Sequence, residues 1–284
     1  AKRRGKKIAC FNVGTGPVTT PAGQRMLREL AEIMEFITVR DQSSLDILKD
    51  IGVKNERLIL TADAALNVAP CDEERIRQIF SQLKLNPEQE ILGININSYI
   101  DTWAGPDHQP MGKAKFLTEY AAALSRAARK LHVPLLFVCS QHNDVAITKE
   151  LMSRVQCNEP KVMISNRQYN HHDLKGVLSR ISLLFGMRLH AMILASSGCT
   201  PIIGLAYQPK CEYYFNTLTL PEHIMRFSAF GEETLLEHIL CGWEKKNAIR
   251  KVLNSRIPVL QREANKAADL VAAMHRDEPV APLL

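Results

Sequence analysis

The sequence predicts an α/β protein made of two Rossmann-like, doubly wound domains. Short apolar runs of strand length alternate with segments of helical length along most of the 284 residues. Glycine-containing or polar segments follow the apolar runs, as expected where a buried strand leads into a helix. Strands that alternate with helices at this spacing form parallel sheets covered on both faces. The polar segment 85–90 separates two such series and sets the predicted domain boundary near residue 87.

The first series predicts an N-terminal domain at residues 1–86. Strands are expected at 7–13, 37–40 and 57–62, and helices at 21–35 and 43–50. The first strand ends in the loop Gly14-Thr15-Gly16-Pro17, which lacks the third glycine of a dinucleotide fingerprint and the lysine of a P-loop. We therefore interpret Gly14 and Gly16 as a tight turn at the interdomain cleft.

The second series predicts a larger domain at residues 87–244 and a helical segment at 245–284. Strands are expected at 91–97, 134–139, 161–164, 181–185 and 201–206, and helices at 113–131, 145–155, 173–178 and 189–197. From about residue 233 the pattern is almost entirely helical, with an interruption expected near Ile257-Pro258. Small residues share one face of the last helix, which predicts close packing along another element. They are Ala264, Ala267, Ala268, Leu270, Ala272 and Ala273.

Composition argues against several function classes. The formal net charge is +6, but Lys2, Arg3, Arg4, Lys6 and Lys7 supply five of these charges, so the rest of the chain is nearly neutral. No basic stripe interleaved with aromatic residues is visible, and nucleic acid is therefore not an expected partner.

Cysteine usage and hydropathy indicate a protein of the cytoplasm. The seven cysteines are scattered and include no C-x-x-C pair, which favours reduced thiols and no zinc or other metal site. No apolar run approaches the roughly 20 residues that cross a bilayer, so no transmembrane segment is expected.

Cationic side chains follow two adjacent strands of the second domain. Arg188 and His190 flank Leu189 at a strand-to-helix junction, and Lys210 follows the next strand. Ligands of open α/β sheets bind beyond the carboxyl ends of the strands. A guanidinium fork suits a phosphate or carboxylate, and an imidazole can transfer a proton near neutral pH. Spacing alone leaves an alternative open, in which the arginine pairs with a buried carboxylate and the histidine bonds to the backbone.

Other polar residues follow other strands of the second domain. Asn95, Asn97 and Ser98 follow its first strand, and His142 follows its second. A hydrogen bond to a sugar and a helix cap are both open for the segment that contains His142. We include these four residues among the candidate substrate contacts.

In the first domain, Ser43 or Asp41 is expected to cap the following helix, with Arg40 in a buried salt bridge. Asp63 is expected to cap rather than to bind a sugar hydroxyl.

Together these motifs resemble the polysaccharide pyruvyl transferase family. The resemblance rests on four motifs in the expected order, which span most of residues 8–215. They are Val39-Arg40-Asp41-x-x-Ser44, Thr61-Ala62-Asp63-Ala64-Ala65, Gly186-Met187-Arg188-Leu189-His190, and Pro201-Ile202-Ile203-Gly204 through Tyr207 and Lys210. The resemblance implies a fold similar to GT-B glycosyltransferases, with two Rossmann-like domains around a cleft and a C-terminal helix that crosses back to the first domain.

The resemblance also implies an activity. Members of this family transfer pyruvate from phosphoenolpyruvate to two hydroxyls of a polysaccharide or its lipid- or nucleotide-linked precursor, forming a ketal and releasing phosphate. Phosphoenolpyruvate is then the donor substrate, and no cofactor is required. By resemblance, Arg188 would hold the donor's phosphate or carboxylate and His190 would supply a proton, with Lys210 as a further anion ligand. Such work in cell-envelope biosynthesis implies a cytoplasmic location, including the inner face of the membrane.

Two features depart from the family pattern. The Gly-Asn-x-Gly-Asp type loop is absent, and only about 86 residues precede the second domain, so the first domain is expected to be incomplete. The arginine that many members carry after the first strand of the second domain is also absent, and Asn97 lies in that segment. Two other functions therefore stay open. One is a GT-B glycosyltransferase with a nucleotide-sugar donor, and the other is a noncatalytic saccharide- or anion-binding module.

Overall fold

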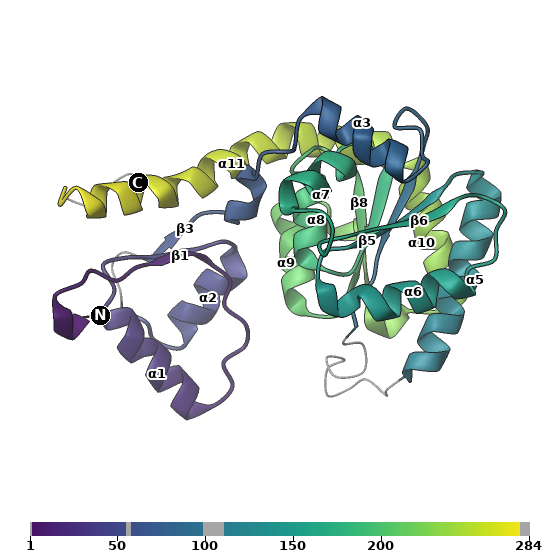
Figure 1. Cartoon of the computed structure of the whole chain (residues 1–284). Coiled ribbons are helices and arrows are strands. Elements are labelled where there is room, and N and C mark those ends of the chain that lie inside the picture. The colour runs from purple at the N-terminus through teal and green to yellow at the C-terminus, as the bar shows by residue number, and fades with distance from the viewer. Residues whose placement is uncertain (1, 55–57, 99–110, 279–284) are drawn as a thin grey trace. The chain divides into compact units, whose positions relative to one another are not determined.

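The structure is a computed structural model, and it describes residues 2–54, 58–98 and 111–278. Parallel strands alternate with helices throughout, so the predicted α/β class is confirmed (Figure 1). The chain divides into two compact units. Unit 1 contains residues 1–67 and 256–284, and unit 2 contains residues 68–255.

Unit 1 contains a three-stranded parallel sheet with the strand order β1-β2-β3. Its elements before residue 68 are η1 (Lys2–Arg4), β1 (Cys10–Val13), α1 (Pro21–Glu32), β2 (Ile37–Val39), α2 (Gln42–Asp50), β3 (Leu58–Leu60) and η2 (Ala64–Asn67). Helix α1 begins where the Thr20 side chain accepts a hydrogen bond from the Gly23 N–H and Pro21 occupies the first turn. Ala31, Val39 and Leu48 are buried in the core of this unit.

The second part of unit 1 comes from α11 (Lys246–His275). Ala264, Ala267 and Leu270 of this helix are at most 2% exposed, and the Asn12 side chain donates to the Ala264 carbonyl at 3.1 Å. The predicted close packing is thus confirmed for Ala264, Ala267, Leu270 and Ala273, whereas Ala272 is half-buried and Ala268 is exposed.

The interruption predicted near Ile257-Pro258 is wrong, because α11 continues through Pro258 and the break lies at Lys245. A proline removes only one N–H donor, and the remaining bonds of this 30-residue helix carry it past that point.

Unit 2 contains a six-stranded parallel sheet with the strand order β6-β5-β4-β7-β8-β9. Its strands are β4 (Leu92–Asn95), β5 (Leu135–Cys139), β6 (Lys161–Ser165), β7 (Leu183–Gly186), β8 (Ile202–Ala206) and β9 (Ile224–Arg226). Its α-helices are α3 (Glu73–Gln82), α5 (Lys113–Leu131), α6 (Val145–Arg154), α7 (His171–Leu178), α8 (Leu189–Ser196), α9 (Pro209–Thr217) and α10 (Glu232–Glu244). Short 3-10 turns are η3 (His142–Asp144), η4 (Pro221–His223) and η5 (Phe227–Ala229).

Helices cover both faces of this sheet. Helices α5, α6 and α10 pack together on one face, while α3, α7, α8 and α9 pack along the other. Helix α3 joins unit 2 through its contact with α7, although residues 73–82 fall inside the range that the sequence analysis gives to the N-terminal domain.

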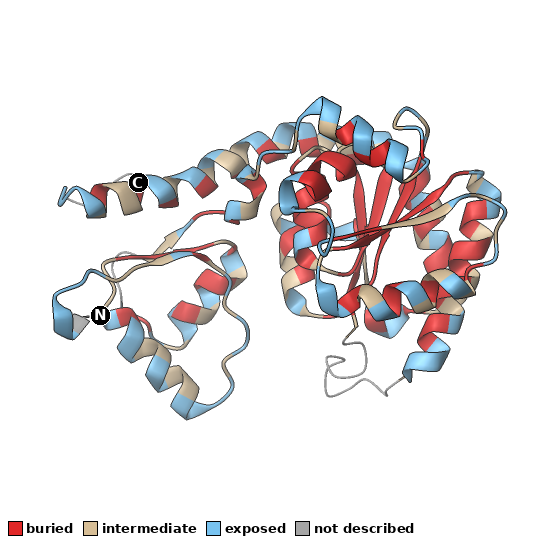
Figure 2. Cartoon of the chain, viewed as in Figure 1, coloured by how far each residue is buried: buried red, intermediate tan, exposed pale blue. Residues whose placement is uncertain are grey.

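The core of unit 2 lies along its central strands. Every residue of β4, β5, β7 and β8 is buried (Figure 2). Near the end of β7, a side chain at Gly186 would lie 2.5 Å from Cγ of Met192, so only glycine lets α8 pack this closely on its strand. This close packing fixes the turn that carries Arg188.

Candidate functional site

Strands β4 and β7 are neighbours at the centre of the sheet of unit 2. From β4 the chain adds β5 and β6 on one side, and from β7 it adds β8 and β9 on the other side, so the strand order reverses between β4 and β7. Parallel pairing places Asn95, at the end of β4, opposite Gly186, at the end of β7. Such a switch point leaves a space beyond the strand ends into which the adjoining loops project. Among the predicted site residues, Asn95 ends β4 and Asn97 and Ser98 follow it. Arg188 and His190 follow β7.

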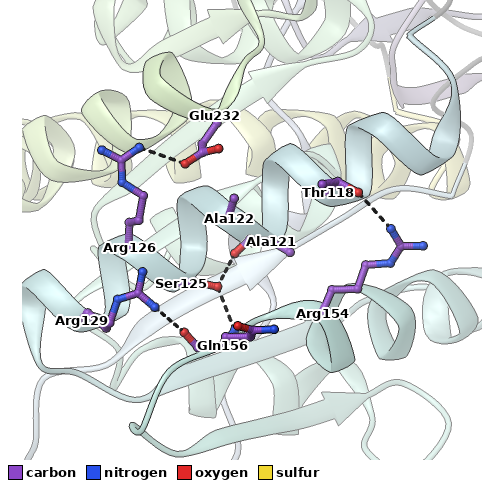
Figure 3. A pocket seen from close by; sticks show the side chains of 9 residues that line it. All are labelled: Thr118, Ala121, Ala122, Ser125, Arg126, Arg129, Arg154, Gln156 and Glu232. Carbon is purple, nitrogen blue, oxygen red and sulfur yellow. Dashed lines mark hydrogen bonds and ion pairs between the residues drawn. The ribbon is translucent and has the colours of Figure 1, made fainter.

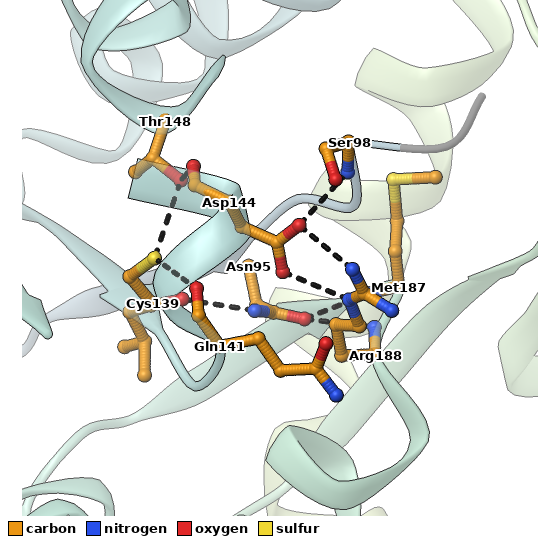
Figure 4. A network of polar contacts seen from close by, with 9 residues as sticks. Asn95, Ser98, Cys139, Gln141, Asp144, Thr148, Met187 and Arg188 are labelled. Carbon is orange, nitrogen blue, oxygen red and sulfur yellow. Dashed lines mark hydrogen bonds and ion pairs between the residues drawn. The ribbon is translucent and has the colours of Figure 1, made fainter. Parts of the chain in front are cut away.

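Asn95 connects three strands at this edge. Its side-chain N–H donates to the Val138 carbonyl of β5 at 2.9 Å, and its Oδ1 accepts from the main-chain N–H of Arg188 at 2.8 Å (Figure 4). The side chain is fully buried. Asn95 therefore fixes the first turn after β7, and its direct contact with a substrate stays a prediction.

Arg188 forms a two-point ion pair with Asp144. Its Nε donates to Oδ2 at 2.8 Å, and its Nη2 donates to Oδ1 at 2.7 Å. The Asp144 side chain is 0% exposed and that of Arg188 is 12% exposed. This is the paired arrangement that spacing alone left open. Arg188 is nevertheless the N-cap residue of α8, so it still lies at the edge of the sheet where the candidate site is expected.

Asp144 also reaches the end of β4. Its Oδ1 accepts a hydrogen bond from the main-chain N–H of Ser98 at 3.0 Å. Asp144 follows β5 and Arg188 follows β7, so the ion pair passes over the end of β4, which lies between those strands (Figure 4). One carboxylate thus ties together the ends of three adjacent strands.

Tyr207, directly after β8, lies between two of the predicted cationic residues. The ammonium of Lys210 sits over its ring at 5.3 Å from the centroid, and its hydroxyl interacts electrostatically with the Arg188 guanidinium. Tyr207 is 7% exposed, and Lys210 in the first turn of α9 is half-buried. A cation over an aromatic face is stabilised electrostatically. Tyr207 therefore links Arg188 to Lys210.

Burial and charge act against each other in this cluster. Burial is the largest single influence on the pKa of the Arg188 guanidinium and lowers it, but the hydrogen bonds and charge attraction to Asp144, together with Tyr207, outweigh burial and leave the pKa raised. Burial raises the pKa of the Tyr207 hydroxyl, and the nearby Arg188 opposes this shift. Both residues therefore keep their protons at neutral pH, so Arg188 is a cation and Tyr207 is neutral.

The remaining predicted residues of unit 2 are less closely joined to this cluster. His190 is exposed in the first turn of α8, two positions after Arg188. Asn97 is 1% exposed, and the Ser98 hydroxyl is buried without a partner among the described residues. His142 is exposed at the start of η3. The structure thus brings Arg188 and Lys210 together around Tyr207 and places His190 in the adjacent helical turn.

Gly14 and Gly16 belong to unit 1, and the two glycines differ. A side chain at Gly14 would lie 2.5 Å from Nε of Arg40, whereas one at Gly16 would meet nothing within 4 Å. Arg40 pairs with Asp63 at 3.0 Å, and Asp41 caps α2 by accepting from the Ser44 N–H at 2.7 Å. The predicted salt bridge of Arg40 is confirmed, and of the two residues predicted as the cap, Ser43 or Asp41, the structure shows Asp41.

A separate surface pocket of about 510 Å³ lies between α5, α6 and α10 (Figure 3). Its three arginines already have partners: Arg126 pairs with Glu232 at 2.9 Å, Arg129 donates to the Gln156 carbonyl at 2.8 Å, and Arg154 donates to Thr118 at 3.2 Å. This pocket shares no residue with the cluster around Arg188. The volume of this pocket does not by itself indicate a reaction or a ligand, so the cluster around Arg188 is the stronger candidate site.

Over the part of the chain that the structure describes, no three or more His, Cys, Asp or Glu side chains are grouped to hold a metal ion. No helix in the same residues is long and apolar enough to cross a membrane.

Two residues of the cluster were absent from the predicted site. Asp144 lies in the polar segment 140–144 that follows the strand predicted at 134–139, and Tyr207 belongs to the motif that ends in Lys210. Position at a strand end was the available signal for both. Their contact with Arg188 depends on strand order, which the sequence pattern does not reveal.

Solved structures with a similar fold are enzymes and sugar-nucleotide-binding proteins. The HepE protein of Anabaena, solved with UDP and glucose, matches with a TM-score of 0.61 at 11% identity, over 97% of this chain and 73% of that one. A UDP-GlcNAc 2-epimerase of Neisseria meningitidis, bound to UDP-GlcNAc, matches with a TM-score of 0.62 at 12% identity, over 96% of this chain and 71% of that one. Together with the parallel sheets, these likenesses define a GT-B-like α/β fold.

A family model, polysaccharide pyruvyl transferase, matches residues 1–209. This match covers more than half of the chain and includes Arg188 and His190. The chain belongs to the polysaccharide pyruvyl transferase family and is a transferase by that membership. No curated protein matches the sequence significantly.

Proposed function

We propose that this protein transfers pyruvate from phosphoenolpyruvate to two hydroxyls of a saccharide, with release of phosphate. The observation that carries the proposal is the arrangement of Arg188 and Lys210 around Tyr207, with His190 in the adjoining turn of α8. Two cations at a sheet edge suit a small donor that bears both a carboxylate and a phosphate. The acceptor is a polysaccharide or its precursor, as family membership supports.

The reaction needs one proton donor and one stabilised leaving group. His190 gives a proton to the methylene carbon of phosphoenolpyruvate, which becomes a methyl group and leaves the central carbon electrophilic. The oxygen of one sugar hydroxyl bonds to that carbon, and the oxygen of the second displaces phosphate as the ketal closes. The hydroxyl protons leave to solvent, and one of them restores His190. Arg188 and Lys210 stabilise the charge on the departing phosphate.

Phosphate release tests this function. The full chain is incubated with phosphoenolpyruvate and candidate saccharides, free and lipid-diphosphate-linked, while phosphate is measured and the acceptor is weighed by mass spectrometry. We expect acceptor-dependent phosphate release and an acceptor that gains one pyruvate and loses one water. His190→Ala should lower the rate about a hundredfold, since general acid catalysis contributes about 10²–10⁴-fold.

His132→Asn provides the matched control. His132 is also an exposed histidine of unit 2, with a side chain 83% exposed, and its left-handed backbone (φ 54°) accepts asparagine. This variant should keep the wild-type rate. Turnover of UDP-sugars without turnover of phosphoenolpyruvate would replace the proposal with a glycosyltransferase, and saccharide binding without any turnover would replace it with a binding module.

A further inference from the structure

The most fully buried charged group near the candidate site is the carboxylate of Asp144. It accepts bonds from Nε and Nη2 of Arg188 and from the N–H of Ser98, at 2.7–3.0 Å. Burying an ionised carboxylate is costly unless charge and hydrogen bonds compensate it. These three bonds supply that compensation, and they all come from the ends of β4 and β7.

Asp144 is itself held from the side of β5. Its main-chain N–H donates to the Gln141 carbonyl at 3.0 Å, and its carbonyl accepts from the Thr148 hydroxyl at 2.7 Å. The residue is also the N-cap of α6. The carboxylate therefore projects from an anchored backbone and has little freedom to follow a moving partner.

This geometry fixes the plane of the Arg188 guanidinium. The edge formed by Nε and Nη2 faces Asp144, which turns Nη1 away from that carboxylate. We propose that Asp144 is a positioning residue of the pyruvyl transfer reaction, which orients Arg188 toward the anionic donor without touching it. The inference rests on the proposed function.

The chain offers an internal comparison for this role. Arg75 and Asp173 form a second two-point pair, with Nε to Oδ1 at 3.1 Å and Nη2 to Oδ2 at 3.2 Å, between α3 and α7. The Asp173 side chain is 6% exposed, and Arg75 is 38% exposed. The chemistry matches that of Asp144 and Arg188, but none of the predicted site residues takes part. Asp173→Asn is therefore a control for the loss of a buried carboxylate as such.

Steady-state kinetics of the full chain test the proposal. Asp144→Asn should lower kcat/KM for phosphoenolpyruvate about tenfold or more, as loss of an orienting partner commonly does. Asp173→Asn should stay within about twofold of wild type, while both variants lower the thermal midpoint to a similar extent. If Asp144 acts through Arg188, Asp144→Asn combined with Arg188→Lys should lose no more than Arg188→Lys alone. Wild-type kinetics in Asp144→Asn, or independent losses that multiply in the double variant, would overturn the proposal.

Two further measurements keep the outcome clear. The ¹⁵Nε–¹H signal of Arg188, assigned by its loss in Arg188→Lys, should be slow to exchange in the wild type and should exchange faster or shift in Asp144→Asn. An unchanged signal overturns the inference even if no pyruvyl transfer is found, whereas absent phosphate release in the wild type contradicts the proposed function alone.

If Asp144→Asn does not fold, Asp144→Glu keeps the charge but displaces it by one methylene. It should lower kcat/KM about fivefold or more, and wild-type turnover in it would contradict the proposal.

Discussion

Arg40 in unit 1 and Arg188 in unit 2 are two versions of the same local arrangement. Arg40 directly follows β2 and pairs with Asp63, which comes after β3. Arg188 lies two residues after the end of β7 and pairs with Asp144, which comes after β5. Their side chains are almost equally buried, with 16% and 12% exposed. The residue types and burial alone therefore do not separate Arg40 from Arg188, the arginine proposed to bind the donor.

The partners of the two carboxylates separate them. In unit 1, Asp63 accepts from Arg40 at 3.0 Å and also from the Ala65 N–H at 2.9 Å, so its carboxylate is shared with the start of η2. The Arg40 guanidinium in turn lies against Gly14. In unit 2, Asp144 makes two bonds to Arg188, and Tyr207 extends the cluster to Lys210. The first arrangement closes backbone turns, and the second orients a cationic side chain.

The largest expected effect comes from replacing each arginine by lysine. Arg188→Lys should reduce kcat/KM for phosphoenolpyruvate by about 10²–10³, or roughly 3–4 kcal/mol, because an ammonium cannot reproduce the planar two-point contact. Arg40→Lys should mainly destabilise unit 1, with kcat/KM changed less than about threefold. Steady-state kinetics beside thermal melts check both variants. Equal kinetic losses would mean that the comparison is wrong.

The next largest effect is a loss of stability at low pH, which we expect in unit 2 and not in unit 1. His238 in α10 packs its ring against Phe185, and burial lowers its pKa to about 4. Burial also lowers the pKa of the neighbouring His223. The folded state thus favours neutral His238, whereas the unfolded chain binds a proton there below about pH 6.5. The stabilisation of the folded state by neutral His238 is complete above about pH 6.5 and is lost as the pH falls toward 4. The loss amounts to at most about 3 kcal/mol for a shift of this size.

This acid effect belongs to unit 2, since unit 1 carries only His275, which is exposed. Both tryptophans of the chain lie in the residue range of unit 2, and Trp243 in α10 is 8% exposed. Denaturant titrations followed by tryptophan fluorescence between pH 7 and 4, in the wild type and in His238→Gln, measure the loss. The variant should show a flatter pH dependence. An identical slope in both proteins would contradict the assignment to His238.

A smaller effect concerns the two glycines that follow β1. In Gly14→Ala the new methyl group would meet the Arg40 guanidinium, which must move away from Asp63, and unit 1 should lose about 1–2 kcal/mol of stability. In Gly16→Ala the methyl group meets nothing within 4 Å, so the change should stay within about 0.5 kcal/mol. Hydrogen exchange of the β2 amides reports on unit 1 and checks both. Equal protection in the two variants would argue against a packing role of Arg40.

Much of the fold was predictable because its signals are local. The apolar runs located the described strands β1 to β8, whereas β9 was not predicted. The residue preferences of a helix N-cap narrowed the cap of α2 to Asp41 or Ser43, and the structure shows Asp41 in that role. The edge of the sheet that carries Arg188 followed from the general rule on strand ends.

The pairing of Arg188 was not predictable from a local pattern. Asp144 lies 44 positions earlier, and the two meet because β5 and β7 both pair with β4 and end at the same edge of the sheet. Strand order is a property of the whole sheet. Likewise, the break between the last helices lies at Lys245 and not at Pro258, because the remaining hydrogen bonds of the 30-residue helix α11 outweigh the local preference of one proline.

The composition of unit 1 has a consequence for synthesis on the ribosome. Asn12 bonds to Ala264 across 252 positions, while all residues of unit 2 are contiguous between 68 and 255. Unit 2 can therefore fold as soon as its own stretch has emerged, whereas the three short strands of unit 1 must wait for the helix that completes their core. Closing such a long loop is slow unless its ends are brought together first. A compact unit 2 shortens the effective separation of the two chain segments that form unit 1, so its early folding lowers the entropic cost of bringing those segments together.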